Sequence, residues 1–70
     1  MPGLIPSWQD IEARRMALAI SRAEMARRAG ISESTIFKGL QKNGKPHRLL
    51  WKQIDLTLSL EEQLQKGDAA

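Results

Sequence analysis

Residues 21–36 of the chain, SRAEMARRAGISESTI, contain the start and stop signals of two short helices set close together. Ser21 and Glu24 form a capping-box pattern, in which each side chain satisfies a backbone N–H of a new helix, and Gly30 is a typical C-terminal stop. Ser32 can cap the next helix at once, so only Gly30 and Ile31 remain as a connection. The stretch therefore predicts a helix over 22–29, a tight turn, and a second helix from Ser32 to about Leu40.

The flanking segments also favour helices. Ser7 can cap a helix whose apolar positions recur near the helical period, at Ile11, Ala13, Met16, Ala17 and Ile20. Residues 43–46, NGKP, are typical of a turn, and Pro46 suits the first position of a following helix. In that helix Leu50, Ile54 and Leu58 form an i, i+4 stripe, which Leu60 and Leu64 extend.

The C-terminal segment leaves two alternatives. Ser59 with Glu62 could cap a separate fifth helix, but we favour one long helix over about 46–66, followed by a frayed tail from Gly67 to Ala70. Alternating Leu56, Leu58 and Leu60 would also suit a strand, which we reject because no partner strand is predicted. The expected fold class is all-α, a compact bundle of four to five helices.

The length of 70 residues bounds the domain organisation, because it is enough for one compact domain over 1–70 and no more. A core of this size stabilises a fold only marginally, and the chain has no cysteine to form a disulfide. We therefore expect dimerisation or ligand binding to add stability. No apolar run approaches the roughly 18 residues of a membrane span, and the expected location is cytoplasmic.

Charge is distributed unevenly along the chain. The net charge is +3, but the segment from Arg14 to Lys52 holds ten basic residues against two acids, Glu24 and Glu33, a local net charge of +8. Acidic residues lie on both flanks. Charge alone favours a polyanion-binding surface and an ordinary solvated face about equally.

Nothing in the sequence indicates an enzyme, a cofactor or a metal site. His47 is the only histidine and has no cysteine to complete a ligand set. Ser7, Ser21 and Ser32 are explained as caps, and no glycine-rich phosphate loop accompanies them. We interpret Trp8 and Trp51 as core or groove-lining aromatics.

The 21–36 stretch resembles the helix-turn-helix of the Cro and phage repressor family, also called the xenobiotic-response-element family, and the resemblance extends over about Ile11 to Leu58. Its spacing has a physical reason: Ala26 is small where the next helix crosses, Gly30 makes the turn, and Met25, Ile31 and Ile36 fill the interface. The resemblance implies a lambda-repressor-like fold with its helix-turn-helix at about 21–41. One departure is Gly39, where the family usually carries a bulky apolar residue, so we expect Leu40 to take over that core contact.

The resemblance also implies a binding site. In this family the second helix of the pair reads base edges in the major groove. The corresponding base-reading positions are Glu33, Ser34, Thr35 and Lys38, and the corresponding phosphate contacts are Arg22, Asn43, Lys45 and Arg48. Glu33 could instead only complement the helix dipole. We expect Phe37 to pack against Leu40 or Trp51 rather than to touch a thymine methyl.

The function so predicted is a sequence-specific regulator of transcription, a nucleoid-associated repressor that binds double-stranded DNA at an operator. We expect a homodimer held partly by Ile54 to Leu64, because one helix reads only a few base pairs and the leucines there exceed what a small core needs. The alternative is that these leucines complete the monomer core. A second function hypothesis is an antitoxin-like or adaptor module that binds another protein through the C-terminal helix.

Overall fold

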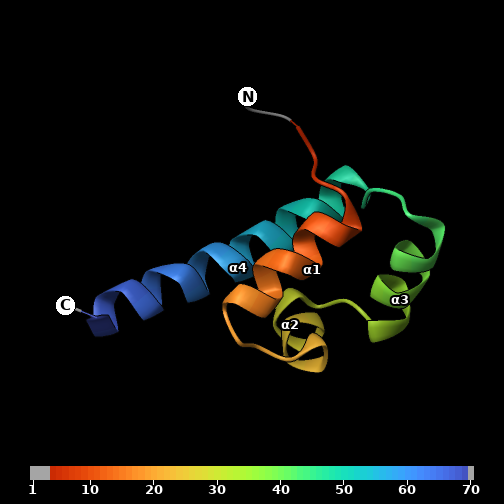
Figure 1. Cartoon of the computed structure of the whole chain (residues 1–70). Helices are drawn as coiled ribbons and strands as arrows, with labels where there is room; N and C mark the ends of the chain where they lie inside the picture. The colour runs from red at the N-terminus through yellow and green to blue at the C-terminus, as the bar shows by residue number, and fades with distance from the viewer. Residues whose placement is uncertain (1–3, 70) are drawn as a thin grey trace.

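The computed structural model describes residues 4–69, with side chains through residue 67, and in this range it contains four α-helices and no strand (Figure 1). The helices are α1 (Trp8–Ala17), α2 (Arg22–Ala29), α3 (Glu33–Lys42) and α4 (Arg48–Ala69). The expected all-helical bundle is confirmed, and its C-terminal segment is one long helix. Helix α4 also includes residues 67–69, which were expected to fray, while Ala70 lies outside the described residues.

Serine side chains cap the first three helices, as predicted. In each case the serine Oγ accepts a hydrogen bond from the backbone N–H three residues later, at 3.1 Å for Ser7, 3.0 Å for Ser21 and 3.3 Å for Ser32. The second half of the capping box at Ser21 is not formed, because the Glu24 carboxylate pairs with Arg27 and Arg28 instead.

Left-handed residues end α2 and α3. Gly30 has a φ of 74° and follows α2, as expected for a glycine stop. Asn43 has a φ of 55° and ends α3 at Lys42, two residues beyond the predicted end. Asparagine is among the few residue types that tolerate this conformation, so the residue at position 43 itself favours the end of α3.

Helix α4 begins at Arg48 rather than at Pro46. His47 occupies the capping position, where its Nδ1 accepts a hydrogen bond from the backbone N–H of Leu49 at 3.2 Å. Pro46 is buried just before the helix. The single histidine thus has a structural role at a helix start.

The core lies where α2 packs against both α3 and α4 and where α1 packs against α3. The buried apolar side chains come from all four helices and from the residue that follows α1. They are Trp8, Ile11, Leu18, Met25, Ala26, Ala29, Ile36, Ile54 and Leu58. Met25, Ala26 and Ile36 lie between α2 and α3, as predicted, and the half-buried Ile31 and Leu40 pack against the same cluster.

The predicted apolar face of α1 is partly wrong. Met16 is 66% exposed, and Ala13 and Ala17 are also exposed. The buried side runs instead from Trp8 through Ile11 to Leu18, and Arg14 and Arg15 occupy the intervening turn of that same side. The pattern of apolar residues alone predicted the wrong side of α1 as buried, because Arg14 and Arg15, which pair with carboxylates, lie on the buried side.

Gly39 of α3 lies against the indole of Trp8. A Cβ atom at residue 39 would come within 2.2 Å of the indole Nε1, a distance that no side chain can accept. The space that a bulky residue at position 39 would fill is therefore filled by Trp8 from α1. Leu40 contributes to the core as expected, but the large aromatic is the main substitute.

Helix α4 is the longest element and extends beyond the other three at its C-terminal end (Figure 1). Ile54 and Leu58 are fully buried, and Leu50 packs against the core, which confirms the predicted stripe, whereas Leu60 and Leu64 are exposed and do not extend it. Within the described residues, no helix is both long and apolar enough to span a bilayer.

Candidate nucleic-acid interface

Apart from Lys66 near the end of α4, the basic residues fall into two groups that the linear sequence does not separate. All five arginines of α1 and α2 form ion pairs with carboxylates. Most of these carboxylates come from the acidic flanks of the sequence, which the fold returns to the arginines. The pairs are Arg14 with Asp55 and Glu62, Arg15 and Arg22 with Glu12, Arg27 and Arg28 with Glu24, and Arg28 with Glu61.

Arg14 ties α1 to α4. Its guanidinium makes a two-point contact with Glu62, at 2.7 and 2.8 Å, and donates further bonds of 3.2 Å to Asp55 and Ser59. A planar fork that meets a carboxylate in this way gives the strongest type of ion pair. The hydrogen bonds from Arg14 hold the pKa of the Glu62 carboxyl below its usual range.

Glu12 ties α1 to α2. It accepts hydrogen bonds from Arg15 at 2.6 and 3.0 Å and from Arg22 at 2.8 Å, and these bonds, that from Arg15 first, lower its pKa although partial burial opposes the change. Arg22, predicted to bind a phosphate, is thus held by a carboxylate of the same chain. Its guanidinium carbon also lies 5.2 Å from the centre of the Phe37 ring, within cation–π range.

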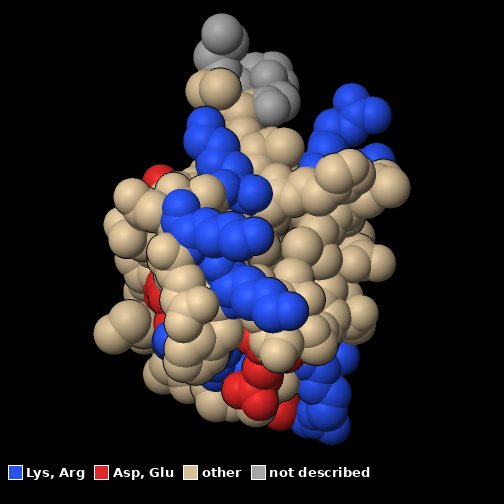
Figure 2. Space-filling model, turned by 90° about the vertical axis from the view of Figure 1, so that its right-hand side faces the viewer, with Lys and Arg blue, Asp and Glu red and all other residues tan. Residues whose placement is uncertain are grey.

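The second group of basic residues has no carboxylate partner in the part of the chain that the structure describes. It consists of exposed side chains on α3, the connection to α4 and the first two turns of α4: Lys38, Lys42, Lys45, Arg48 and Lys52. We call this group the basic face. Figure 2 looks onto the α3 end of the molecule and shows basic side chains across much of this surface, with carboxylates toward the left and lower margins of the view. The positive charge left uncompensated therefore gathers around α3.

The outward side of α3 carries most of the predicted base-reading residues. Glu33, Ser34 and Lys38 are exposed on it, and Gln41 continues the same side one turn later. Thr35 is half-buried, and its hydroxyl lies 2.9 Å from Ser32 Oγ, so it belongs to the cap more than to the open surface.

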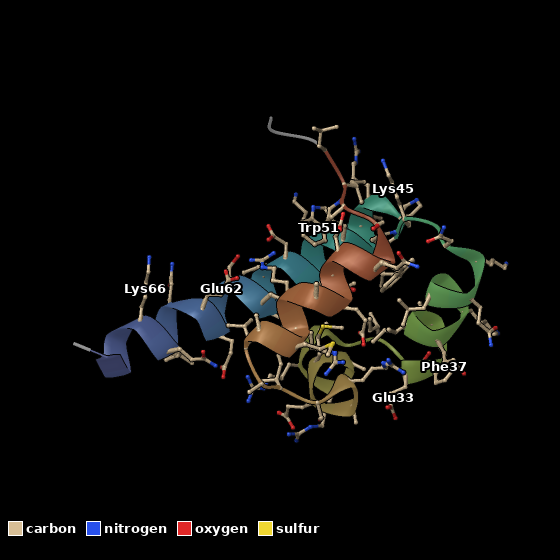
Figure 3. The ribbon with its side chains drawn as sticks, viewed as in Figure 1. Glu33, Phe37, Lys45, Trp51, Glu62 and Lys66 are labelled. Carbon is tan, nitrogen blue, oxygen red and sulfur yellow. The ribbon has the colours of Figure 1, made fainter. Side chains whose placement is uncertain are left out.

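Phe37 differs from its expected position. It is 54% exposed on α3, beneath the Arg22 guanidinium, instead of packing into the bundle against Leu40 or Trp51. Figure 3 shows it on the half of α3 that also carries Glu33. The reason is helical phase: Ile36 and Leu40 take the inward side, which leaves residue 37 on the outer one.

Backbone hydrogen bonds fix the connection between α3 and α4. The Trp8 N–H donates to the Gly44 carbonyl at 2.9 Å, and the Gly44 N–H donates to the Gly39 carbonyl at 3.3 Å. Asn43, Lys45 and Arg48, three predicted phosphate contacts, are exposed on or next to this connection. The start of α1 therefore holds them beside α3.

The sequence did not lead us to assign Gln41 to the outward side of α3, or Lys42 and Lys52 to the basic face. Gln41 follows Ser34 by seven residues and Phe37 by four, a spacing that places the three on one side of a helix. The periodicity would have identified it once α3 was known to continue past Leu40 to Lys42. Lys52 required the fold, because it lies on α4.

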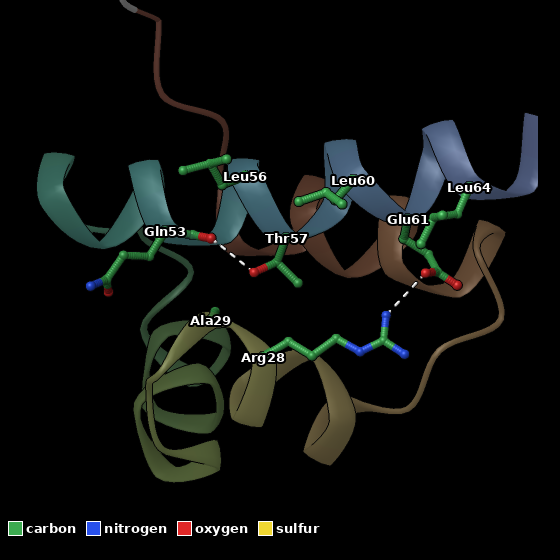
Figure 4. A pocket seen from close by; sticks show the side chains of 8 residues that line it. All are labelled: Arg28, Ala29, Gln53, Leu56, Thr57, Leu60, Glu61 and Leu64. Atoms are coloured by element: carbon green, nitrogen blue, oxygen red, sulfur yellow. Dashed lines mark hydrogen bonds and ion pairs between the residues drawn. The ribbon is translucent and has the colours of Figure 1, made fainter.

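A separate hollow of about 350 Å³ runs between α2 and α4 (Figure 4). Its apolar members on α4 are Leu56, Leu60 and Leu64, which are 64%, 54% and 58% exposed, and we call them the leucine face. An ion pair of 3.0 Å from Arg28 to Glu61 crosses between the two helices. The expectation that these three leucines exceed the needs of the core is confirmed, whereas Leu58 is buried.

In the described residues, no three histidine, cysteine or acidic side chains come together as a metal site would require. No family model matches the chain, and no curated protein or solved structure matches it. The resemblance in residues 21–36 thus rests on those residues themselves.

Proposed function

We propose that the protein is a sequence-specific DNA-binding regulator in which α2, residues 30–32 and α3 act as a helix-turn-helix. The observation that carries the proposal is the basic face, whose cations have no carboxylate partner among the described residues and lie around the exposed side of α3. Exposed cations without carboxylate partners, placed around an exposed helix, can neutralise the phosphates that flank a major groove. A pure adaptor has no need for them.

In this arrangement α3 enters the major groove. Ser34 and Lys38 contact base edges, with Lys38 suited to guanine O6 and N7, and Glu33 accepts from cytosine N4 or complements the dipole of α3. Asn43, Lys45 and Arg48 contact phosphates on one side of the groove. The protein represses transcription by occupying its operator in the cytoplasm.

The leucine face supports a homodimer as the functional unit. Three large exposed leucines at i, i+4 and i+8 form one strip along α4, whose C-terminal half extends away from α3 (Figure 1). A second copy that covers this strip leaves both α3 helices free for two half-sites. The same strip could bind a different protein, as an antitoxin-like module would.

Sedimentation distinguishes the two occupants. Leu60→Glu with Leu64→Glu adds charge where both side chains are exposed, so the fold persists while the dimer dissociates. The matched control, Gln63→Glu, adds a charge to an exposed neighbour on α4. Wild-type protein that is monomeric with and without DNA excludes the homodimer and favours a partner protein.

The test of DNA binding is the affinity of the protein for duplexes enriched from a random library, measured against salt. Each phosphate contact adds about −0.9 to the slope of log K against log salt. Replacing Lys42, Lys45 and Arg48 together by Gln, three cations of the basic face that are not assigned to base edges, should reduce the slope by about 2.7 and the affinity by roughly 100-fold at about 0.15 M salt.

Lys66→Gln is the matched control, because Lys66 is an equally exposed lysine at the far end of α4. It should change neither slope nor affinity. If no duplex is enriched, or if Lys66→Gln weakens binding as much as the triple substitution does, the proposed function is wrong.

A further inference from the structure

Phe37 is an isolated aromatic on an otherwise polar surface. It is 54% exposed, and the side chains that share the outward side of α3 with it, Ser34, Lys38 and Gln41, are polar. Its exposure costs hydration free energy that an inward position would avoid. An exposed ring among polar side chains is suited to contact a small apolar group of a ligand.

The ring is held in place on one side. The Arg22 guanidinium lies 5.2 Å from the ring centre, and Arg22 is itself fixed by Glu12 Oε1 at 2.8 Å. A carboxylate on α1 thus positions an arginine on α2, which positions an aromatic on α3. The rest of the ring stays open to solvent, with a restricted orientation.

The surroundings of the ring restrict what could cover it. A protein partner generally needs a wide apolar patch, and the outward neighbours of Phe37 offer none. A small apolar group set among hydrogen-bonding edges and phosphates fits better. In the major groove of DNA the only such group is the C5 methyl of thymine.

Gln41 lies one helical turn after Phe37 on the same side, at a distance along the helix of about 6 Å. An exposed carboxamide can bond adenine through N6 and N7 together. The separation corresponds to about two base-pair steps of 3.4 Å. Phe37 and Gln41 are therefore spaced to read two A·T pairs that lie about two steps apart.

We propose that Phe37 and Gln41 make the protein selective for A·T base pairs, Phe37 through the thymine methyl group and Gln41 through adenine N6 and N7. This inference rests on the proposed function, since it places the outward side of α3 in the major groove. It adds two specificity-determining residues to those that the sequence indicated.

The experiment uses the full chain and a duplex enriched from a random library, in which each thymine is replaced in turn by uracil. The replacement removes only the methyl group. For the wild type, uracil at one position should weaken binding about fourfold, the loss expected for one buried methyl. Phe37→Ala should bind the two duplexes within twofold of each other.

Three further variants test the assignment. Met16→Ala, which removes an equally exposed apolar side chain from α1, should keep the full response to uracil. Phe37→Gln, polar and of similar length, should lose the response, so the result does not depend on the folding of one variant. Gln41→Ala should keep the response and relax the preference for adenine at one position.

The outcomes separate the two proposals. If no duplex is enriched, both are overturned. If a duplex binds but uracil has no effect at any thymine, or if Phe37→Ala and Phe37→Gln respond to uracil as the wild type does, only this inference is wrong.

Discussion

The arginines of α1 and α2 and the basic face around α3 carry the same charge but serve different purposes. The five arginines lie within 4 Å of carboxylates from α1, α2 or α4, and the ion pairs of Arg14, Arg22 and Arg28 join these helices to one another. The basic face, four of whose five members are lysines, has no such partner in the described range. A guanidinium pairs well with a carboxylate at two points, whereas a flexible, hydrated ammonium is better suited to remain free for a ligand.

This difference predicts that changes among the arginines alter stability and that changes on the basic face alter binding. The following substitutions test the division, beginning with the largest expected effect.

Gly39→Ala tests whether the inward side of α3 is purely structural. The new Cβ would collide with the buried indole of Trp8, so either α1 or α3 must shift. We expect the free energy of unfolding to fall by about 2 to 3 kcal/mol. Urea denaturation measures it, and Gly67→Ala, where nothing lies near the added atom, is the control. Equal stability of the two variants would show that the indole does not fill this space.

Arg14→Ala tests the strongest contact of the arginine group. It leaves Glu62, Asp55 and Ser59 without their shared donor and should lower the free energy of unfolding by about 1 to 2 kcal/mol, between the values for exposed and buried pairs. The affinity of the folded protein for duplex DNA should not change. Arg27→Ala, whose side chain is 76% exposed, should have no measurable effect on stability. A loss of DNA affinity in folded Arg14→Ala would break the division.

Arg22→Ala is the sharpest test, because Arg22 was predicted to bind a phosphate but is paired with Glu12. Loss of the ion pair and of the contact with Phe37 should lower the free energy of unfolding by about 1 kcal/mol. The slope of log K against log salt should stay that of the wild type. A slope smaller by about one unit, with unchanged stability, would instead return Arg22 to the phosphate contacts.

Acid should weaken the ion pairs that the arginines of α1 and α2 make with carboxylates. The expected loss of stability is smaller than for the substitutions above. The pKa values of Glu12, Glu24 and Glu62 are lowered in the folded protein by their arginines. Their contribution to stability is therefore complete above the unfolded pKa of about 4.3 and is lost as the pH falls through the lower folded values. Thermal unfolding measured from about pH 6 down to about pH 3 should show Tm falling toward the acid end of this range. In Arg14→Gln the fall should be shallower, because Glu62 loses the cause of its shift; identical curves would contradict this.

The sequence could predict what is local. The caps at Ser7, Ser21 and Ser32 and the stop at Gly30 each depend on a few neighbouring residues, and all four are observed. The ion pair of Arg14 with Glu62 joins residues 48 positions apart, and no local pattern indicates it. The local charge of +8 therefore overstated the free positive charge. The exposure of Phe37 could have been predicted from helical phase with Ile36 and Leu40.

The contact of Trp8 with Gly39 has a consequence for how this sequence can diverge. The two residues occupy one volume, so neither can be replaced alone by a residue of very different size. In homologous chains we expect them to covary: a smaller residue at the start of α1 should accompany a bulky one at the middle of α3, and the reverse. A bulky residue in α3 with a small one in α1, and the reverse arrangement found here, are then two solutions for filling the same space, and changing from one to the other requires two substitutions that are compatible only together.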